Sequence, residues 1–287
     1  MALTLRGNGQ ITSDNYTIDS DGAVTATNAT VSGNVSVDTN TLKVDATNNR
    51  VGIGTNTPAY KLQIHESAAA GEGIFMTNSH NQAGTYSDLK WAWSTTPGDQ
   101  SYGSGLRFRQ VDTTHGGQLE FYTDNASGTY TKQMQIDENG SVTKPNQPSF
   151  QAYGSSQWQT VTSGNTQVIA LNVAHSNIGS HYDTSTYRFT APVAGQYLFS
   201  INCYCRLETH DDDSNHAYVF LRKNGATYIN AIAIYGYYNS GDVDQTQNVC
   251  CLMTMAAGDY ATAELNAASG DASAYRGATT FSGFLVG

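Results

Sequence analysis

Residues 171–201 constrain the fold of this chain more than any other stretch, because aromatic, Asn and Gly residues occur there at fixed intervals within an alternating pattern. The clearest case is a strand-like run made of Tyr197, Phe199 and Ile201. A spacing of two is the period of a β-strand, so these side chains share one face of a sheet. Just upstream, Pro192 and Gly195 predict a tight turn. The region therefore predicts two strands joined by a turn.

Composition extends this prediction to the whole chain of 287 residues. Only 13% of the residues are charged, whereas Gly (28 residues) and Tyr (18 residues) are abundant. The strong helix formers Glu, Lys, Leu and Arg are therefore scarce, and the mixture favours strands and turns. We expect an all-β protein.

The spacing in residues 171–201 resembles the signature of the C1q globular domain, the trimeric jelly roll shared with the tumour necrosis factor family. Six residues fall on the positions of that pattern: Asn177, Tyr182, Phe189, Gly195, Tyr197 and Phe199. Leu171 and Ile201 depart from it but keep a large apolar side chain. The resemblance covers residues 151–287 and implies a C1q-like jelly-roll head that assembles as a homotrimer. It also implies that Phe189, Gly195, Tyr197 and Phe199 build the domain core or the trimer interface.

Residues 1–58 form short alternating pieces separated by Asp-Gly, Ser-Gly and Asn-Asn turn signals. Each piece carries one or two small apolar side chains, so one copy buries too little surface to offset the entropy lost on ordering. We predict an intertwined β stalk that draws its partners from identical chains. Residues 59–143 contain longer alternating segments with aromatic residues and predict a small β-sandwich-like middle domain. Residues 144–150, with Pro145 and Pro148, predict a short stiff linker.

Two segments are similar to recurrent segments of bacteriophage tail fibres and tailspikes: residues 48–64 and residues 134–142. Their order, ahead of a C1q-like head, implies a bacteriophage tail fibre or receptor-binding protein. On this resemblance the chain would be made in the host cytoplasm, released by lysis and located in the virion tail. Its N-terminal region would bind other phage tail proteins, and its head would bind a host surface polysaccharide or lipopolysaccharide.

Charge and motifs exclude several other functions. The net charge of −10 opposes binding to nucleic acid or to an anionic membrane. No run reaches the roughly 18 apolar residues that span a bilayer, and the first residues lack the apolar core of a signal peptide. Neither a G-x-S-x-G elbow nor an H-E-x-x-H motif is present, and no loop suits phosphate binding. We therefore expect a protein that is not an enzyme, although a hidden pair of glycosidase carboxylates stays open.

The four cysteines occur as the pairs Cys203, Cys205 and Cys250, Cys251, whose spacing does not suit a zinc site. Two interpretations stay open for them. They are reduced thiols that pack as small hydrophobic groups, or they form one cross-strand disulfide.

Family topology implies that the turns at residues 191–196, 223–227 and 256–259 lie at the stalk-facing end of the head. It places residues 206–216, 239–246 and 266–276 together at the distal tip, where a trimer would triplicate them. The candidate receptor-binding residues in these polar loops are His210, Asp211, Asp212, Asp213, His216, Asp242, Asp244, Asp271, Tyr275 and Arg276.

Calcium is the one cofactor that we predict as a candidate at the tip. Asp211, Asp213 and Asp242 offer the carboxylate oxygens that calcium prefers. Against this, adjacent aspartates lack the alternate spacing of a compact calcium loop, and acidic loops are usually just solvated. A tyrosine group is a candidate for sugar contact or, alternatively, for packing: Tyr228, Tyr235, Tyr237 and Tyr238.

Our leading hypothesis from the sequence is thus a trimeric phage fibre that recognises a host surface glycan through the distal loops. The first alternative is a secreted C1q-domain lectin or adaptor. The others are a purely structural virion fibre subunit and a polysaccharide-degrading enzyme.

Overall fold

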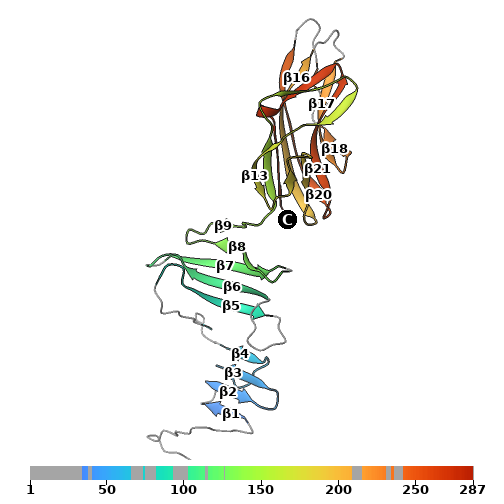
Figure 1. The fold of residues 1–287 in the computed structure, drawn as a ribbon. Coiled ribbons are helices and arrows are strands. Elements are labelled where there is room, and N and C mark those ends of the chain that lie inside the picture. Colours follow the sequence, from blue (N-terminus) through green and yellow to red (C-terminus); the bar gives the residue numbers. More distant parts are fainter. Residues whose placement is uncertain are drawn as a thin grey trace, which may run out of the picture. The chain divides into compact units, whose positions relative to one another are not determined.

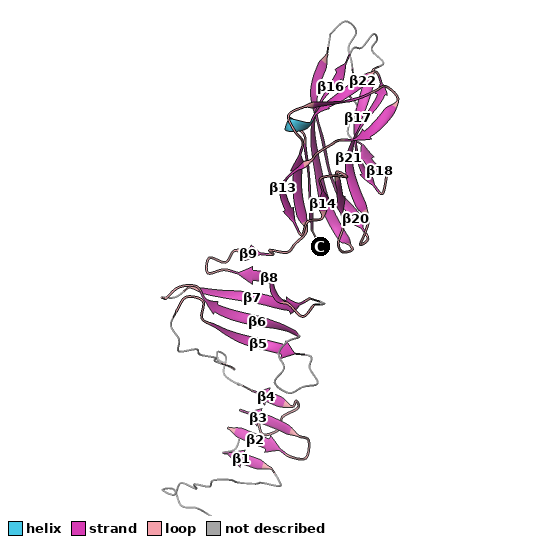
Figure 2. Cartoon of the chain, in the orientation of Figure 1, coloured by secondary structure: helices cyan, strands magenta, loops and turns pink. Residues whose placement is uncertain are grey.

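The computed structural model describes most of the chain, and every regular element in the described part is a strand except one short 3₁₀ turn, η1 (Arg276–Ala278) (Figures 1 and 2). The prediction of an all-β protein is confirmed. Two compact units are present, residues 1–77 and residues 78–287. The structure describes residues 34–37, 41–65, 74, 82–92, 103–113, 116–125, 127–208, 215–230, 234–235 and 242–286.

The first unit contains a four-stranded sheet in the order β1-β2-β3-β4. β1, β2 and β3 pair antiparallel, whereas β4 pairs parallel with β3. β4 therefore belongs to this sheet and not to the middle domain, in which the sequence places residues 59–143. The loop before β4 is closed by Arg50, whose Nη1 donates to the Pro58 carbonyl at 2.9 Å. The strands are β1 (Val35–Val37), β2 (Leu42–Asp45), β3 (Arg50–Ile53) and β4 (Leu62–Ile64).

The middle region forms a five-stranded antiparallel sheet in which each strand pairs with the next along the chain. A chain of consecutive hairpins builds a single layer, so the second layer of the expected sandwich is not found among the described residues. The predicted alternating segments do lie in these strands. They are β5 (Tyr86–Ala92), β6 (Gly103–Gln110), β7 (Gly117–Asp124), β8 (Tyr130–Ile136) and β9 (Val142–Thr143).

The C-terminal region is a two-sheet sandwich, which we call the C-terminal sandwich. The first sheet has the order β11-β22-β16-β23-β10-β13, and β20 pairs with β16. Its strands are β10 (Ser149–Tyr153), β11 (Trp158–Val161), β13 (Val173–Ile178), β16 (Gly195–Glu208), β20 (Val243–Met255), β22 (Asp271–Tyr275) and β23 (Thr280–Leu285).

The second sheet has the order β14-β15-β21-β17-β18, with β12 beside β21 and β19 beside β17. Together the two sheets enclose one hydrophobic core. The strands of the second sheet are β12 (Asn165–Val168), β14 (Tyr182–Asp183), β15 (Arg188–Thr190), β17 (His216–Lys223), β18 (Ala226–Asn230), β19 (Ile234–Tyr235) and β21 (Tyr260–Ser269).

The aromatic residues of the 171–201 pattern lie inside this core. Phe189, Tyr197 and Phe199 are all 0% exposed, so they build the domain core rather than a subunit interface. Phe150 packs among them, with its ring centroid 4.9 Å from that of Phe189. Gly195 begins β16 opposite Met255. Alternation along the strand thus identified the core correctly.

Two polar residues of the same pattern form hydrogen bonds to the backbone. The Asn177 side chain donates to the Tyr182 carbonyl at 2.8 Å and accepts from the Tyr182 N–H at 3.0 Å. The Tyr182 hydroxyl donates to the Leu171 carbonyl at 2.9 Å while its ring stays buried, and burial raises the pKa of this phenol. These bonds satisfy polar groups that would otherwise be buried without partners.

The two ends of the C-terminal sandwich differ in the turns that they carry. Pro148 leads into β10 at one end, which we call the base, where its carbonyl accepts from the Leu285 N–H at 3.0 Å. The Ala191 N–H donates to the Asp259 carbonyl at 2.8 Å, and Lys223 pairs with Asp259 at 2.8 Å, so the three turns predicted for this end do lie together. Glu208 pairs in register with Asp271 at the opposite end, which we call the tip.

All four cysteines are free. Register explains this, because Cys250 lies opposite Ser200 and Cys251 opposite Phe199, so no cysteine faces another across the β16–β20 ladder. Cys203 and Cys205 are buried and pack as small hydrophobic groups, whereas Cys250 is exposed.

Candidate binding surface

The outer face of the first sheet carries a charged cluster near the tip, centred on Arg206. β16 and β20 place Arg206 directly opposite Asp244. The guanidinium donates to both Asp244 carboxylate oxygens, from Nε at 2.6 Å and from Nη2 at 3.0 Å. Its Nη1 donates to Asp242 Oδ2 at 3.0 Å. Such a bidentate pair fixes the plane of the guanidinium.

Hydrogen bonding favours the charged forms of Arg206 and Asp244. The hydrogen bond from Arg206 lowers the pKa of the Asp244 carboxyl, and the same bond raises the pKa of Arg206. The Tyr204 hydroxyl donates to Asp244 Oδ2 at 2.9 Å, which raises the pKa of Tyr204 and favours its neutral form. The cluster thus combines an ion pair with a neutral phenol.

Three aromatic rings lie beside the charged cluster. The Trp158 ring centroid is 5.6 Å from that of Tyr204 and 5.2 Å from that of Tyr275. Arg206 lies over the Trp158 ring at 4.5 Å, within the range of a cation–π contact. Trp158 remains 36% exposed. The surface thus combines flat apolar rings with fixed charges.

Sequence reasoning missed Trp158, Tyr204 and Arg206 as members of this surface. A signal for two of them was present, because Tyr204 and Arg206 alternate with buried cysteines along β16 and must therefore point outward. Trp158 stands on a different strand, and only the pairing of β11 with β22 brings it to Tyr275.

The structure separates the predicted tip residues into three groups. Asp242 and Asp244 pair with Arg206, and the Tyr275 ring packs against Trp158 and Tyr204 beside them. His216, Asp271 and Arg276 make other contacts: the His216 ring packs against Tyr218, Asp271 Oδ1 accepts from the Ser163 N–H at 2.8 Å, and Arg276 Nη2 donates to Gln157 Oε1 at 2.9 Å. His210, Asp211, Asp212 and Asp213 lie outside the described residues.

The calcium prediction depends on residues that are only partly described. Asp211 and Asp213 lie outside the described part, and Asp242 is paired with Arg206. Within the described residues, no three His, Cys, Asp or Glu side chains come together as a metal site would require. Calcium binding therefore stays a prediction.

The tyrosine group is likewise only partly described. Tyr228 is 46% exposed, and its hydroxyl donates to the Leu252 carbonyl at 3.2 Å. Tyr237, Tyr238 and the Tyr235 side chain lie outside the described part.

An apolar row crosses the same outer face nearer the base. Leu198 lies opposite Leu252 on one side and opposite Phe284 on the other. Leu252 is 51% exposed and Phe284 is 46% exposed. Isolated exposed apolar residues are ordinary, but three in register make a continuous patch.

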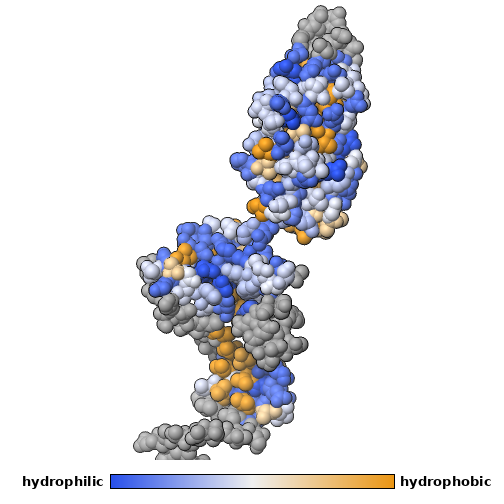
Figure 3. Space-filling view, viewed as in Figure 1, coloured by the Kyte–Doolittle hydropathy of each residue, from blue (hydrophilic) through white to orange (hydrophobic). Residues whose placement is uncertain are grey.

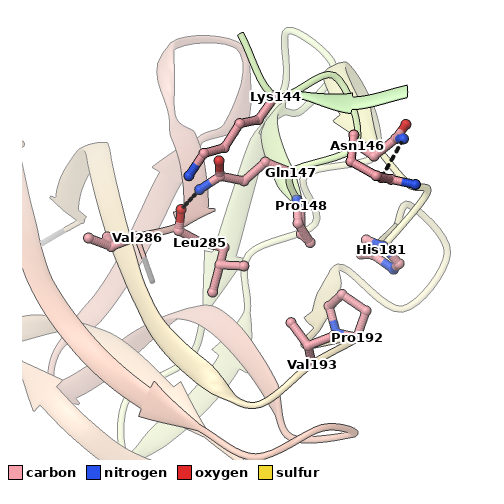
Figure 4. A pocket seen from close by; sticks show the side chains of 10 residues that line it. Lys144, Asn146, Gln147, Pro148, His181, Pro192, Val193, Leu285 and Val286 are labelled. Carbon is pink, nitrogen blue, oxygen red and sulfur yellow. Dashed lines mark hydrogen bonds between the residues drawn. The ribbon is translucent and has the colours of Figure 1, made fainter. Parts of the chain in front are cut away.

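At the base, a pocket lies where the linker meets the C-terminal sandwich (Figure 4). Gln147 donates a side-chain hydrogen bond to the Leu285 carbonyl, as the dashed line shows, and Pro148 and Val193 line the apolar part. His181 also lines the pocket, and burial lowers its pKa. The side chains here join the linker to the sandwich and lie at the opposite end from the charged cluster.

Among the described residues, no helix has the length and apolar character needed to cross a membrane.

Two packed antiparallel sheets around a closed aromatic core define the C-terminal region as a β-sandwich domain. Comparison with known families makes the assignment more specific, because residues 150–286 match the family model described as the C1q domain. The C-terminal sandwich is therefore a jelly-roll domain of the C1q and tumour necrosis factor kind.

Curated relatives agree with this assignment. The chain is 32% identical over 120 residues to "Complement C1q tumor necrosis factor-related protein 3" of Mus musculus and of Homo sapiens, which is 41% of this chain and 44% of each relative. It thus spans less than half the length of these relatives.

Matching solved structures include "Globular Domain of Zebrafish Complement 1qA protein", at 18% identity and a TM-score of 0.35. That match covers 49% of this chain and 98% of the other. Another is "Structure of Eiger TNF from S. frugiperda", at 14% identity and a TM-score of 0.40, covering 50% of this chain and 94% of the other.

These comparisons overturn the leading hypothesis from the sequence. The curated relatives are complement C1q tumour-necrosis-factor-related proteins rather than virion components, so the predictions of a phage fibre, a virion location and a host-glycan receptor are wrong. Phage tail proteins and lipopolysaccharide find no support as partners. The findings favour the first alternative, a secreted C1q-domain protein.

Proposed function

We propose that this chain is a secreted, homotrimeric C1q-domain recognition module of the lectin or adaptor class, and that it acts by binding rather than by catalysis. The match of residues 150–286 to the C1q domain is the observation that carries this proposal. The region before residue 144 serves in it as a β-rich stalk that presents the head.

The outer face of the first sheet supplies the subunit interface in this proposal. The row of Leu198, Leu252 and Phe284 supports it, since burying such side chains removes apolar surface from water. Each large apolar side chain that becomes fully buried contributes about 1.5–3 kcal/mol.

The tip supplies the ligand surface, and its charge favours a partner with basic groups. Glu208, Asp242, Asp244 and Asp271 bring four carboxylates to the described part of the tip, where Arg206 pairs with only two of them. A trimer would present this acidic surface three times, and weak contacts made together gain avidity. Binding would weaken as salt screens the charges.

A charge variant on the apolar row tests the subunit interface. We expect Leu252→Asp to yield monomers in sedimentation velocity, because it introduces a charge where neighbouring copies would meet. Gln167→Asp, on an exposed position of the second sheet, is the matched control and should leave the trimer intact. A trimer that survives Leu252→Asp unchanged would remove this face from the proposal.

A second experiment tests the ligand surface. Asp242→Lys, placed on an exposed carboxylate, should weaken capture of basic extracellular proteins on an array without changing the oligomeric state. Capture that is unaffected by this change and by added salt would place the ligand site elsewhere.

A further inference from the structure

The five-stranded middle sheet has one polar face whose charged groups already satisfy one another. Arg107 donates from Nε and Nη2 to the two Asp88 carboxylate oxygens, each at 2.8 Å. Glu120 is only 2% exposed and accepts from Arg109 and Lys132, each at 3.1 Å. Figure 3 shows this part of the chain as largely hydrophilic. This face needs no partner.

The opposite face of the same sheet is apolar across four strands. Register aligns its side chains in two rows: Leu89, Leu106, Phe121 and Met134 in the first, and Phe108, Leu119, Ile136 and Val142 in the second. Several of them are well exposed: Leu89 is 43% exposed, Phe108 is 45% and Val142 is 57%. Trp91, which lies beyond the first row on β5, is 54% exposed. No charged residue interrupts either row.

The size of this face is that of a large surface patch. The five strands hold 32 residues in all, which at about 4.8 Å between strands and about 3.4 Å per residue give a face of roughly 520 Å². That is near the upper end of the roughly 300–600 Å² that the largest apolar patch of a soluble monomer covers, and patches of this size are often functional. It is about two-thirds of the roughly 800 Å² that each partner contributes to a standard interface.

We propose that the apolar face of the middle sheet is a second assembly surface, and that its occupants are the equivalent faces of the other copies of this chain in the homotrimer. This inference rests on the proposed trimer of the head. Only residues 144–148 separate β9 from β10, so a trimeric head would hold three middle sheets close together at high effective concentration. Uncharged rows are self-complementary, because identical faces meet without like-charge repulsion.

The N-terminal sheet independently shows the same one-sided pattern. Its register places six apolar side chains on one face: Leu42, Val44, Val51, Ile53, Leu62 and Ile64. Leu62 is 61% exposed and Ile53 is 42% exposed, and Figure 3 shows apolar side chains gathered over this sheet. Two sheets in separate units thus each leave an apolar face exposed, and copies of the same chain would cover both faces.

Site-directed cross-linking of the full chain tests the proposal. Phe108→Cys is made in a Cys250→Ser background, which removes the exposed native thiol, and is treated with a short bismaleimide before a denaturing gel. Gln118→Cys on the neighbouring strand is the matched control, because Gln118 faces the polar side beside Arg109. Leu89→Cys serves as a second variant on the apolar face. Sedimentation of each sample reports its oligomeric state before cross-linking.

Chains carrying Phe108→Cys or Leu89→Cys should be linked to other chains on the order of tenfold more than chains carrying Gln118→Cys, because copies held together react at high effective concentration. A trimer in which positions 89 and 108 link no more than position 118 overturns this inference while leaving the trimeric head intact. A chain that sediments as a monomer overturns the proposed trimer, and with it the proposal that other copies of the chain cover this face. Thiols at positions 89 and 108 that resist maleimide in that monomer would show that other residues of the same chain cover the face.

Discussion

The C-terminal sandwich and the middle sheet are both built from alternating strands, but only the sandwich completes its own core. In the sandwich two sheets face each other, and Phe189, Tyr197 and Phe199 are fully buried between them. In the middle region the described strands form one layer, and residues such as Phe108 are 45% exposed. The same period of two therefore yields a closed domain in one region and an unpaired face in the other.

The difference shows what alternation specifies and what it leaves open. An alternating strand states that one face will be buried. The pattern does not specify whether the covering layer comes from the same chain. In the sandwich the covering layer does come from the same chain, because strands β10 to β23 are distributed over two sheets. In the middle sheet consecutive hairpins keep every described strand in one layer, so the covering layer must come from outside these five strands.

The largest expected effect comes from removing a ring inside the closed core. Phe199→Ala should lower the free energy of unfolding of the sandwich by about 3–5 kcal/mol, because it loses buried apolar area and leaves a cavity. Chemical denaturation followed by near-ultraviolet circular dichroism measures this. The loss should be the same at low and high chain concentration. A loss below about 1 kcal/mol would mean that the core does not have the packing described.

A smaller effect, of a different kind, is expected on the open face. Phe108→Asp should destabilise the assembled middle sheet by about 1.5–3 kcal/mol, the value of one large side chain withdrawn from water. The effect should appear in the trimer and not in dissociated chains, because the wild-type face is buried only in the assembly. Hydrogen exchange of β6 in the trimer measures it, with Gln118→Asp as the control. An effect no larger than that of Gln118→Asp contradicts burial between copies.

The polar face of the middle sheet should be more modestly sensitive. Glu120→Gln removes the carboxylate shared by Arg109 and Lys132 and should cost about 1–2 kcal/mol, less than for a fully buried pair because both partners are partly exposed. Burial by itself would raise the pKa of Glu120, but the hydrogen bonds from Arg109 and Lys132 outweigh it and lower the pKa. Exchange protection of β7 is the readout. Glu138→Gln, in an exposed turn, should leave that protection unchanged.

The smallest effect concerns acid stability at the base of the sandwich. Hydrogen bonds from Lys223, then Asn224 and the Ala256 N–H, lower the pKa of Asp259 from 3.8 to about 2. A carboxylate with a lowered folded-state pKa contributes stability above its ordinary pKa and loses it as the pH falls through the folded-state value.

Urea unfolding between pH 3.8 and about 2 checks this prediction. Over that interval the wild type should lose more stability than Asp259→Asn, which lacks this titration. Parallel losses in the two proteins would argue that Lys223 and Asp259 are not paired in solution.

Local sequence patterns predicted the core of the sandwich. The surface near the tip could not be predicted in this way, because its residues come together only through the pairing of distant strands. Tyr197 and Phe199 were identified because alternation is a property of neighbouring residues. The pairing of Arg206 with Asp244 joins strands that are distant in sequence and become neighbours only through the β16–β20 ladder. Trp158 joins the cluster through a further ladder. No local pattern contains either contact.

The mistaken assignment to a phage fibre has a physical cause as well. Short alternating strands separated by Gly and Asn turns arise in many β proteins, because such residues are the usual turn formers. Residues 48–64 supply two strands of a small four-stranded sheet, and this pattern does not by itself identify a family. The longer pattern of the C1q domain combines an aromatic core with the Asn177 backbone contacts, and such a combination is far harder to reach by chance.

Sedimentation equilibrium of the full chain gives the most direct test of the proposed trimer, in which two further copies cover both the apolar row of the sandwich and the open faces of the other sheets. We expect a single species with three times the 30.8 kDa mass of one chain, stable over a hundredfold range of concentration. A stable monomer of 30.8 kDa would contradict it, since the apolar rows of the head and the middle sheet would then face water.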